Sequence, residues 1–203
     1  MAYLDEEILK QQKAEKQAEN KEEVNPIEGS VAEGKVILEG KEILFERKEF
    51  LEGQLSLFVP TDIRPMTEEE ITGAYLLGNR PQFLFHSEQT ELSLVLNHTE
   101  NPVQNGQIIQ MAGVAAKLLE RATMNGKIFK KLNFERDEKM IATVELVSNG
   151  FDDGVYSLNF YISLQERLLL GNWNCPAKKM QLNKELAMQM LETMEIKELE
   201  KSV

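Results

Sequence analysis

The chain has 203 residues, of which 42% are hydrophobic and 28% are charged, a composition typical of a globular protein with one sizeable core. Its 34 acidic residues outnumber its 23 basic residues, for a formal net charge of −11. This balance argues against binding to nucleic-acid phosphates or to an anionic membrane, since both need a basic surface. No run approaches the roughly 18 consecutive apolar residues of a membrane-spanning helix. We therefore expect neither nucleic acid nor membrane among the partners.

Cysteine usage and the start of the chain indicate the compartment. Cys175 is the single cysteine, so the chain can form neither an intramolecular disulfide nor a thiolate metal cluster. The first four residues run directly into Asp5, Glu6 and Glu7, without the basic start and apolar segment of a secretory signal. These features fit a reducing compartment, and we expect a cytoplasmic protein.

Residues 1–34 differ in composition from the rest. The first 23 residues contain seven acids and four lysines, with few apolar residues after Leu9. Asn25-Pro26 and Glu28-Gly29-Ser30 would break any helix that starts here. We predict that residues 1–34 form a charged extension, either a frayed helix or a disordered tail, and that residues 35–203 form a single domain.

The first part of that domain has strand patterns and one short helix. Thr67 and Glu70 have the spacing of a capping box, which predicts a helix that continues to about Leu76. Alternating apolar residues and flanking turn residues predict five strands around it. These are Val36–Leu38, Ile43–Arg47, Leu55–Val59, Gln82–His86 and Glu91–Asn97.

Two long helices and four strands follow. Residues 104–124 carry one apolar stripe at three- and four-residue steps. Its members are Ile108, Met111, Ala112, Ala115, Leu118, Leu119 and Ala122. Residues 178–199 have Leu182, Leu186, Met190 and Met194 at four-residue steps. Between the helices, alternation predicts strands at Lys127–Glu135, Met140–Ser148, Tyr156–Leu164 and Arg167–Trp173.

The order of these elements predicts the fold class. Tight turns between most strands favour antiparallel pairing, because parallel pairs need long crossovers. Two amphipathic helices must bury their stripes on a sheet. We predict an α+β fold, with an antiparallel β-sheet of about six or more strands flanked by two long helices.

The sequence offers little catalytic chemistry. It contains no phosphate-binding glycine loop and no nucleophile elbow. A thiol nucleophile at Cys175 would need a base that the pattern does not supply. His86 and His98 are the only imidazoles, and they could form a weak metal or ligand site together with Glu88. We predict that the protein is not an enzyme, with no catalytic residue, no bound metal and no cofactor.

A protein-binding surface would form where exposed apolar groups cluster. The candidates are Trp173, Tyr161, Phe151 and Met188, since large apolar and aromatic side chains are enriched at interface hot spots. Strand alternation favours the core for Trp173, and it also allows Tyr161 to cover the sheet under a helix. The strands Tyr156–Leu164 and Arg167–Trp173 could alternatively supply an exposed edge for sheet extension.

The layout resembles that of the Mog1/PsbP-like family, in its branch of uncharacterised bacterial proteins. The resemblance covers about residues 43–197. The residues that carry it are Leu55–Pro60 with Asp62, the helix 104–124, the hairpins around Asp137 and Asp153, Leu168–Trp173 and the C-terminal helix. It implies a central antiparallel sheet between helices and no shared catalytic residues. Members act as binding or assembly proteins: one branch binds a small GTPase, a plant branch serves photosystem II, and some bacterial relatives are chaperones for secreted effectors.

The first hypothesis is therefore a cytoplasmic protein-binding module, either a chaperone or an adaptor. The first alternative is a small-ligand carrier or weak metal-dependent hydrolase that uses His86, His98 and Glu88. The second alternative is an architectural subunit of a homo-oligomer.

Overall fold

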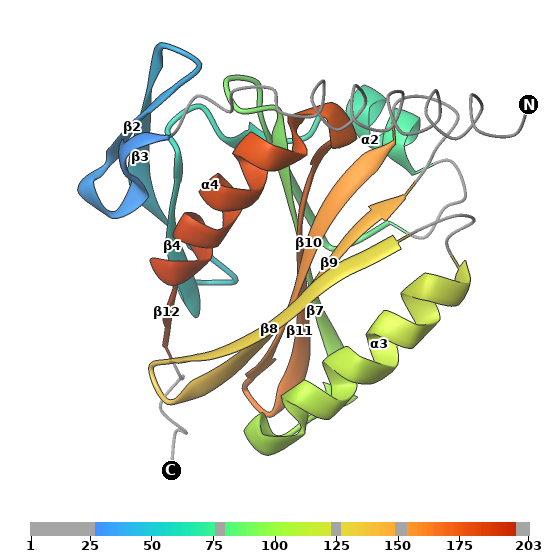
Figure 1. Ribbon diagram of the computed structural model, residues 1–203. Coiled ribbons are helices and arrows are strands. Elements are labelled where there is room, and N and C mark those ends of the chain that lie inside the picture. The colour runs from blue at the N-terminus through green and yellow to red at the C-terminus, as the bar shows by residue number, and fades with distance from the viewer. Residues whose placement is uncertain (1–26, 76–79, 123–126, 149–153, 198–203) are drawn as a thin grey trace, which may run out of the picture.

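Two antiparallel sheets, packed face to face, form the framework of the protein (Figure 1). The computed structural model describes residues 27–75, 80–122, 127–148 and 154–197, and every element named below lies within these ranges. The smaller sheet has the order β1 (Glu28–Ser30), β2 (Lys35–Leu38), β3 (Lys41–Phe50), β4 (Leu55–Pro60) and β12 (Glu195–Ile196). The larger sheet has the order β5 (Arg64–Pro65), β6 (Phe83–Ser87), β7 (Leu92–Pro102), β11 (Arg167–Pro176), β10 (Val155–Leu164), β9 (Lys139–Ser148) and β8 (Lys127–Arg136).

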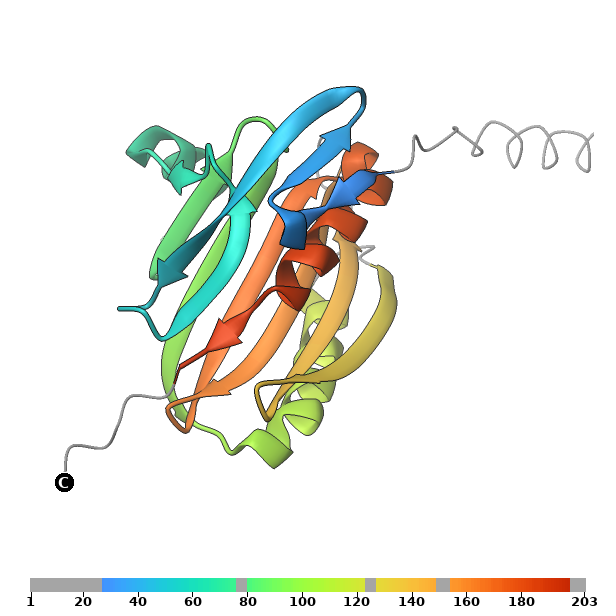
Figure 2. The same ribbon diagram turned by 90° about the vertical axis from the view of Figure 1, so that its left-hand side faces the viewer.

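The helices of the described chain cover both faces of the larger sheet. The α-helices are α2 (Glu68–Ala74), α3 (Ile108–Ala122) and α4 (Met180–Glu192), and short 3-10 turns lie at η1 (Val31–Glu33), η2 (Asn105–Gln107) and η3 (Ala177–Lys179). Figure 2 looks onto the smaller sheet and α4, which lie side by side over one face of the larger sheet. Helix α3 lies on the opposite face (Figure 1). None of the described helices is both long enough and apolar enough to cross a membrane.

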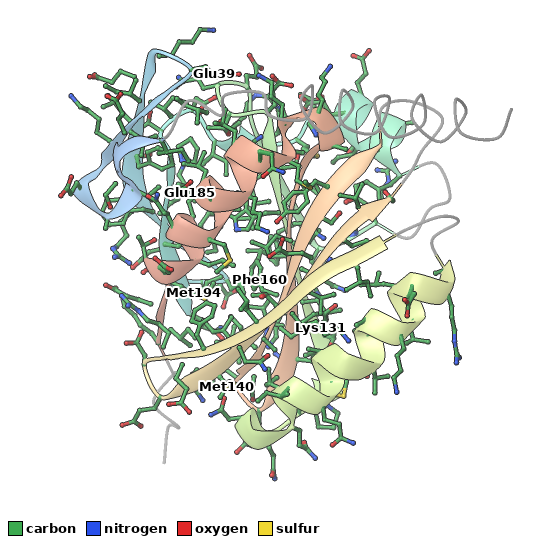
Figure 3. The ribbon with its side chains drawn as sticks, viewed as in Figure 1. Glu39, Lys131, Met140, Phe160, Glu185 and Met194 are labelled. Atoms are coloured by element: carbon green, nitrogen blue, oxygen red, sulfur yellow. The ribbon has the colours of Figure 1, made fainter. Side chains whose placement is uncertain are left out.

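Strand alternation divides the larger sheet into two buried faces. On β10, Tyr156, Leu158, Phe160, Ile162 and Leu164 belong to the main core beneath the smaller sheet and α4. Phe160 and Met194 lie in this space between the layers (Figure 3). The intervening Tyr161 faces α3 and joins a second, smaller core with Ile108, Ala112 and Ala116 of that helix. The two-residue period of a strand thus sends alternate side chains of one strand into two cores.

The predicted α+β class is confirmed, and the predicted sheet arrangement is confirmed only in part. We expected one sheet between two long helices, whereas α4 shares its side of the larger sheet with a second sheet. The first strands of the chain have an apolar face of their own, with Val36, Ile43, Phe45, Leu55 and Leu57 all buried. That face has to be covered, and it packs on the larger sheet.

The predicted boundary at residue 34 lies too late in the chain. Glu28–Ser30 form β1 and pair with β2. Val31 is fully buried, and its backbone N–H donates to Gln189 Oε1 of α4 at 3.1 Å. Residues 28–34 therefore belong to the folded body, and residues 1–26 lie outside the described residues.

The C-terminal helix is shorter than predicted. It ends at Glu192, although the apolar four-residue period continues to Met194. The Thr193 hydroxyl donates to Met190 O at 2.7 Å and accepts from the Phe58 backbone N–H at 2.9 Å. The chain then forms β12, which pairs with β4. Thr193 thus closes the helix and fastens its end to the smaller sheet.

The predicted exposed edge at residues 156–173 is wrong. Both β10 and β11 are hydrogen-bonded on each side, and β8 and β5 are the outer strands of the larger sheet. The hairpin turn predicted around Asp153 and the predicted end of the helix 104–124 lie outside the described residues.

Candidate functional site

Helix α3 covers only part of its face of the larger sheet. It packs on β8, β9 and β10. The residues closest to the sheet are Ile108, Ala112 and Ala116, which are buried against Ala142, Val144, Tyr161 and Leu168. The two alanines allow the helix to approach the sheet closely, and larger apolar side chains of α3 consequently lie at its sides.

A hollow with a volume of about 410 Å³ opens beside α3, over β10, β11 and β7, and we call it the α3 groove. Its wall on the helix is formed by Ala115, Leu118, Leu119 and Ala122. Its floor and far side are formed by Pro81, Val95, Asn97, Asn159, Tyr161, Leu170, Gly171 and Asn172. No side chain in this lining carries a formal charge, although 28% of the chain is charged.

Two asparagines fix the polar part of the groove floor. Asn172 Nδ2 donates to Asn159 Oδ1 at 2.6 Å, and Asn159 Nδ2 donates to the backbone carbonyl of Val144 at 3.2 Å. Asn172 Oδ1 is buried without a hydrogen-bond partner. One row further along the same face, Ser157 Oγ donates to Asn174 Oδ1 at 2.7 Å. These bonds hold the floor side chains in place, so that the groove has a defined shape before anything binds.

The outer rim of the groove carries exposed apolar side chains. Leu118 is 59% exposed and Val114, one turn earlier, is 49% exposed. Our prediction that Leu118 and Ala122 belong to the buried stripe is wrong, since both are exposed. The apolar surface of α3 is wider than the strip that the sheet covers, so these residues form the wall and rim of the groove.

Two cations flank this apolar rim. Lys117 and Arg121 are exposed on α3, one turn apart, and the described residues provide neither with an ion pair. Four arginines elsewhere are paired: Arg47 with Glu195, Arg64 with Glu70 and Glu88, Arg80 with Glu68, and Arg167 with Glu100. Glu120 lies between them on α3, but the described residues show no ion pair between it and either cation.

A second hollow, of about 530 Å³, adjoins the α3 groove. Ser93 and Asn174 line it, and on the same face they are the next residues after Val95 and Asn172 of the groove. His86 Nδ1 lies 3.0 Å from Ser93 Oγ. Cys175 also lines this hollow but is buried, and burial raises the pKa of its thiol to about 11. The thiol is therefore protonated at neutral pH and is a poor nucleophile.

The predicted binding residues lie in different places. Trp173 is fully buried in the main core, as strand alternation favoured, so it is not a surface contact. Tyr161 is buried at the floor of the α3 groove, and burial raises the pKa of its hydroxyl to about 12. Met188 is partly buried against the main core, on the other side of the larger sheet. Phe151 lies outside the described residues.

The predicted site of His86, His98 and Glu88 is wrong. His86 pairs with Ser93 and therefore lies on the α3 face, whereas His98 has the opposite parity on β7. His98 follows Ser93 by five residue steps, or about 16 Å along a strand. The His98 ring instead contacts Leu164 O at 3.0 Å, and Glu88 pairs with Arg64 at 2.8 Å. Among the described residues, no three His, Cys, Asp or Glu side chains are grouped so that they could hold a metal ion.

Sequence reasoning missed the rim residues Val114, Lys117, Leu118 and Arg121 as a surface. The available signal was the width of the apolar surface on α3. It extends beyond the arc that one sheet can bury, so part of it had to stay exposed or meet a partner.

Comparison of the fold with solved structures places the chain in a structural class. It superposes on the cyanobacterial PsbP of Synechocystis sp. PCC 6803 with a TM-score of 0.56, at 11% sequence identity, over 75% of this chain and 92% of that chain. LpqN of Mycobacterium tuberculosis, a protein involved in cell envelope biogenesis, matches with a TM-score of 0.48, at 10% identity, over 76% of this chain and 91% of that chain. The immunity protein TplEi of Pseudomonas aeruginosa, in complex with a peptide, matches with a TM-score of 0.43, at 6% identity, over 80% and 74% of the two chains.

The protein therefore has the Mog1/PsbP-like fold, as the resemblance in sequence layout implied. No protein-family model matches the sequence, and no curated protein matches it. At these sequence identities the similarity establishes the fold alone. A functional proposal therefore has to be argued from the surface of this chain.

Proposed function

We propose that the protein is a non-catalytic, cytoplasmic protein-binding module, a chaperone or adaptor, which holds a segment of a partner protein in the α3 groove. The observation that carries this proposal is the concentration of exposed apolar surface beside an open hollow. Of the six large apolar side chains that are exposed in the described residues, three lie on α3; Leu118 lines the groove, and Val114 lies one helical turn before it. Exposed apolar patches of this kind mark interaction sites.

The energetics favour docking at this place. Full burial of a large apolar side chain contributes about 1.5–3 kcal/mol. Leu118 and Val114 have not gained that energy within the monomer, because about half or more of each remains exposed. A partner side chain that enters the groove would cover both and would also contact Leu170 and Val95 on the floor. A hollow whose floor is already ordered loses little conformational freedom on binding.

The chemistry of the groove supports a binding role without catalysis. Tyr161 is the one titratable group in its lining, and its raised pKa keeps the hydroxyl protonated at neutral pH. Cys175, in the adjoining hollow, is likewise protonated and buried. Neither group supplies the activated nucleophile or general base that a hydrolase needs. A lone cysteine also fits a reducing compartment.

A second candidate function is the carriage of a small apolar ligand. The volume of the α3 groove, about 410 Å³, falls in the range of small-molecule pockets, roughly 300–1,000 Å³. Native mass spectrometry of the purified protein separates the candidates. A carrier retains a non-covalent small molecule that variants of Leu118 lose, whereas a protein-binding module is found without one.

A comparison of two matched variants tests the proposed function. Leu118→Asp places a charge at the groove wall, and Ile109→Asp places the same charge on another flank of α3, where the wild-type side chain is 48% exposed. Because both positions are exposed, both variants should fold. In affinity capture from the native cell, a stoichiometric partner should persist with wild type and Ile109→Asp and be lost with Leu118→Asp. Identical capture by all three proteins would refute docking in the groove.

A further inference from the structure

Accepting the proposed function as a premise, we infer that the α3 groove takes an acidic amphipathic helix. The apolar stripe of this helix would enter the hollow, and its carboxylates would lie opposite Lys117 and Arg121.

The dimensions and backbone pairing of the floor indicate a helix rather than a strand. The groove lies over β10, β11 and β7, which span two inter-strand spacings, or about 10 Å, the width of one helix. All three strands are hydrogen-bonded on both sides, so the floor presents no free strand edge to an extended segment. A helix satisfies its own backbone hydrogen bonds and can lie beside α3 on the same sheet face.

The lining sets the character of the inserted side chains. It contains no charged group, so a charge that entered the hollow would lose water without gaining a counter-ion. The amides of Asn159 and Asn172 are bonded to one another and to the backbone, which leaves Asn172 Oδ1 as an acceptor in the floor. The part of the occupant that faces the floor is therefore mainly apolar, with room for one hydrogen-bond donor.

The two cations at the rim of the groove indicate the charge on the flank of the bound helix. Lys117 immediately precedes Leu118 in the sequence, and Arg121 follows Leu118 by three residues, so both cations lie toward solvent from the groove wall. Both are exposed, and no described residue forms an ion pair with either. A partner helix with two acids one turn apart matches this pair. Exposed ion pairs change affinity by only a few-fold each, and their main effects are on orientation and association rate.

Synthetic helices of defined charge test the inference. Three 18-residue probe peptides would share one leucine stripe and differ on one flank, with glutamate, glutamine or lysine at two positions one turn apart. Fluorescence anisotropy would measure their binding to the full-length protein. We expect the glutamate probe to bind most tightly and the lysine probe at least about ten-fold more weakly at low salt, with the difference shrinking in high salt.

Variants of the protein test whether Lys117 and Arg121 cause the preference for the glutamate probe. In the double variant Lys117→Gln/Arg121→Gln, the preference for glutamate should fall to within two-fold, while binding of the glutamine probe stays unchanged. The double variant Lys35→Gln/Lys41→Gln removes the same charge from the smaller sheet and should keep the preference. Leu118→Asp should weaken all three probes at least ten-fold, and Ile109→Asp should weaken none.

The outcomes separate this inference from the proposed function. If the three probes bind equally well and only Leu118→Asp weakens them, the acidic assignment is wrong and docking in the groove stands. If no probe binds, the helix assignment is overturned, while the capture experiment above still decides the proposed function.

The chain's own residues 3–9 combine Leu4 and Ile8 with three acids. If a full-length Leu4→Ser/Ile8→Ser variant binds the glutamate probe ten-fold more tightly, that segment fills the groove and the assignment to a separate partner is wrong.

Discussion

The ring of Phe160 on β10 lies over Gly171, its direct partner on β11. A Cβ atom at Gly171 would fall within that ring, and Phe160 is fully buried, so it has little room to move aside. Glycine here provides the space that an aromatic side chain occupies in the main core. The other face of Gly171 belongs to the floor of the α3 groove, so this contact also holds the floor in place.

Substitution of Gly171 by alanine should therefore destabilise the protein by about 2 kcal/mol or more, the cost of overpacking a core. The matched control is Gly113→Ala in the middle of α3, where nothing lies within 4 Å of the added Cβ. That change should stabilise the helix by about 0.5–1 kcal/mol. Urea unfolding measures both. Equal free energies of unfolding for Gly171→Ala and wild type would contradict the packing described above.

A buried ion pair fastens α4 to the larger sheet. Glu145 on β9 has a side chain that is 2% exposed, and its Oε2 lies 2.7 Å from Lys184 Nζ on α4. Lys184→Met leaves the carboxylate buried without its partner and should cost about 2 kcal/mol, which allows for the partial exposure of the lysine. The double variant Glu145→Leu/Lys184→Met should recover most of that loss. Chemical denaturation of all four members of the cycle measures the coupling, and additive effects would show that the pair is not coupled.

The Arg64–Glu70 pair gives a prediction about acid stability. The Arg64 guanidinium donates to both carboxylate oxygens of Glu70 at 2.9 Å, and this contact, together with the Thr67 backbone N–H, lowers the pKa of Glu70 to about 2. A lowered pKa in the folded state means that the carboxylate stabilises the fold above its ordinary pKa of 4.5 and that this contribution is lost as the pH falls toward 2.

Carboxyl NMR titration should place the Glu70 midpoint near 2 in wild type and shift it upward toward the ordinary 4.5 in Arg64→Gln, where the Thr67 contacts still lower it. Arg80→Gln removes the arginine that pairs with Glu68 and should leave the Glu70 midpoint unchanged. A wild-type midpoint near 4.5 would mean that the bidentate contact does not persist in solution.

Cys175 should react slowly in the folded protein. It is buried, and its raised pKa of about 11 keeps the thiolate population low at pH 8. We expect labelling by a thiol reagent at pH 8 to be at least about 100-fold slower in buffer than in denaturing urea. Rapid stoichiometric labelling of the native protein would show that the thiol is accessible, and it would reopen a catalytic role.

The strands could be predicted well because their alternation is local. The run Tyr156–Leu164 reads as one strand, and five of its side chains lie in the main core. The end of α4 was harder to predict, because the contact of Thr193 with Phe58 joins residues 135 positions apart, and the apolar period continues past the helix. The separation of the strands into two sheets likewise depends on packing between distant segments.

For the candidate site, the sequence contained more than our prediction used. Hairpin register pairs His86 with Ser93, and the odd separation of Ser93 from His98 already places the two imidazoles on opposite faces. The groove itself could not be predicted in this way. Its form depends on how closely Ala112 and Ala116 bring α3 to the sheet and on which side of the helix then remains uncovered.

Site-specific photocrosslinking tests the central claim most directly. A photoreactive phenylalanine analogue would replace Leu118 at the groove, Ile109 on another flank of α3, or Leu44 on the smaller sheet, three positions that are each about half exposed or more. In the native cell, position 118 should give one dominant protein adduct, which positions 109 and 44 do not give. The same adduct at all three positions, or a stronger adduct at position 44, would contradict a partner in the α3 groove.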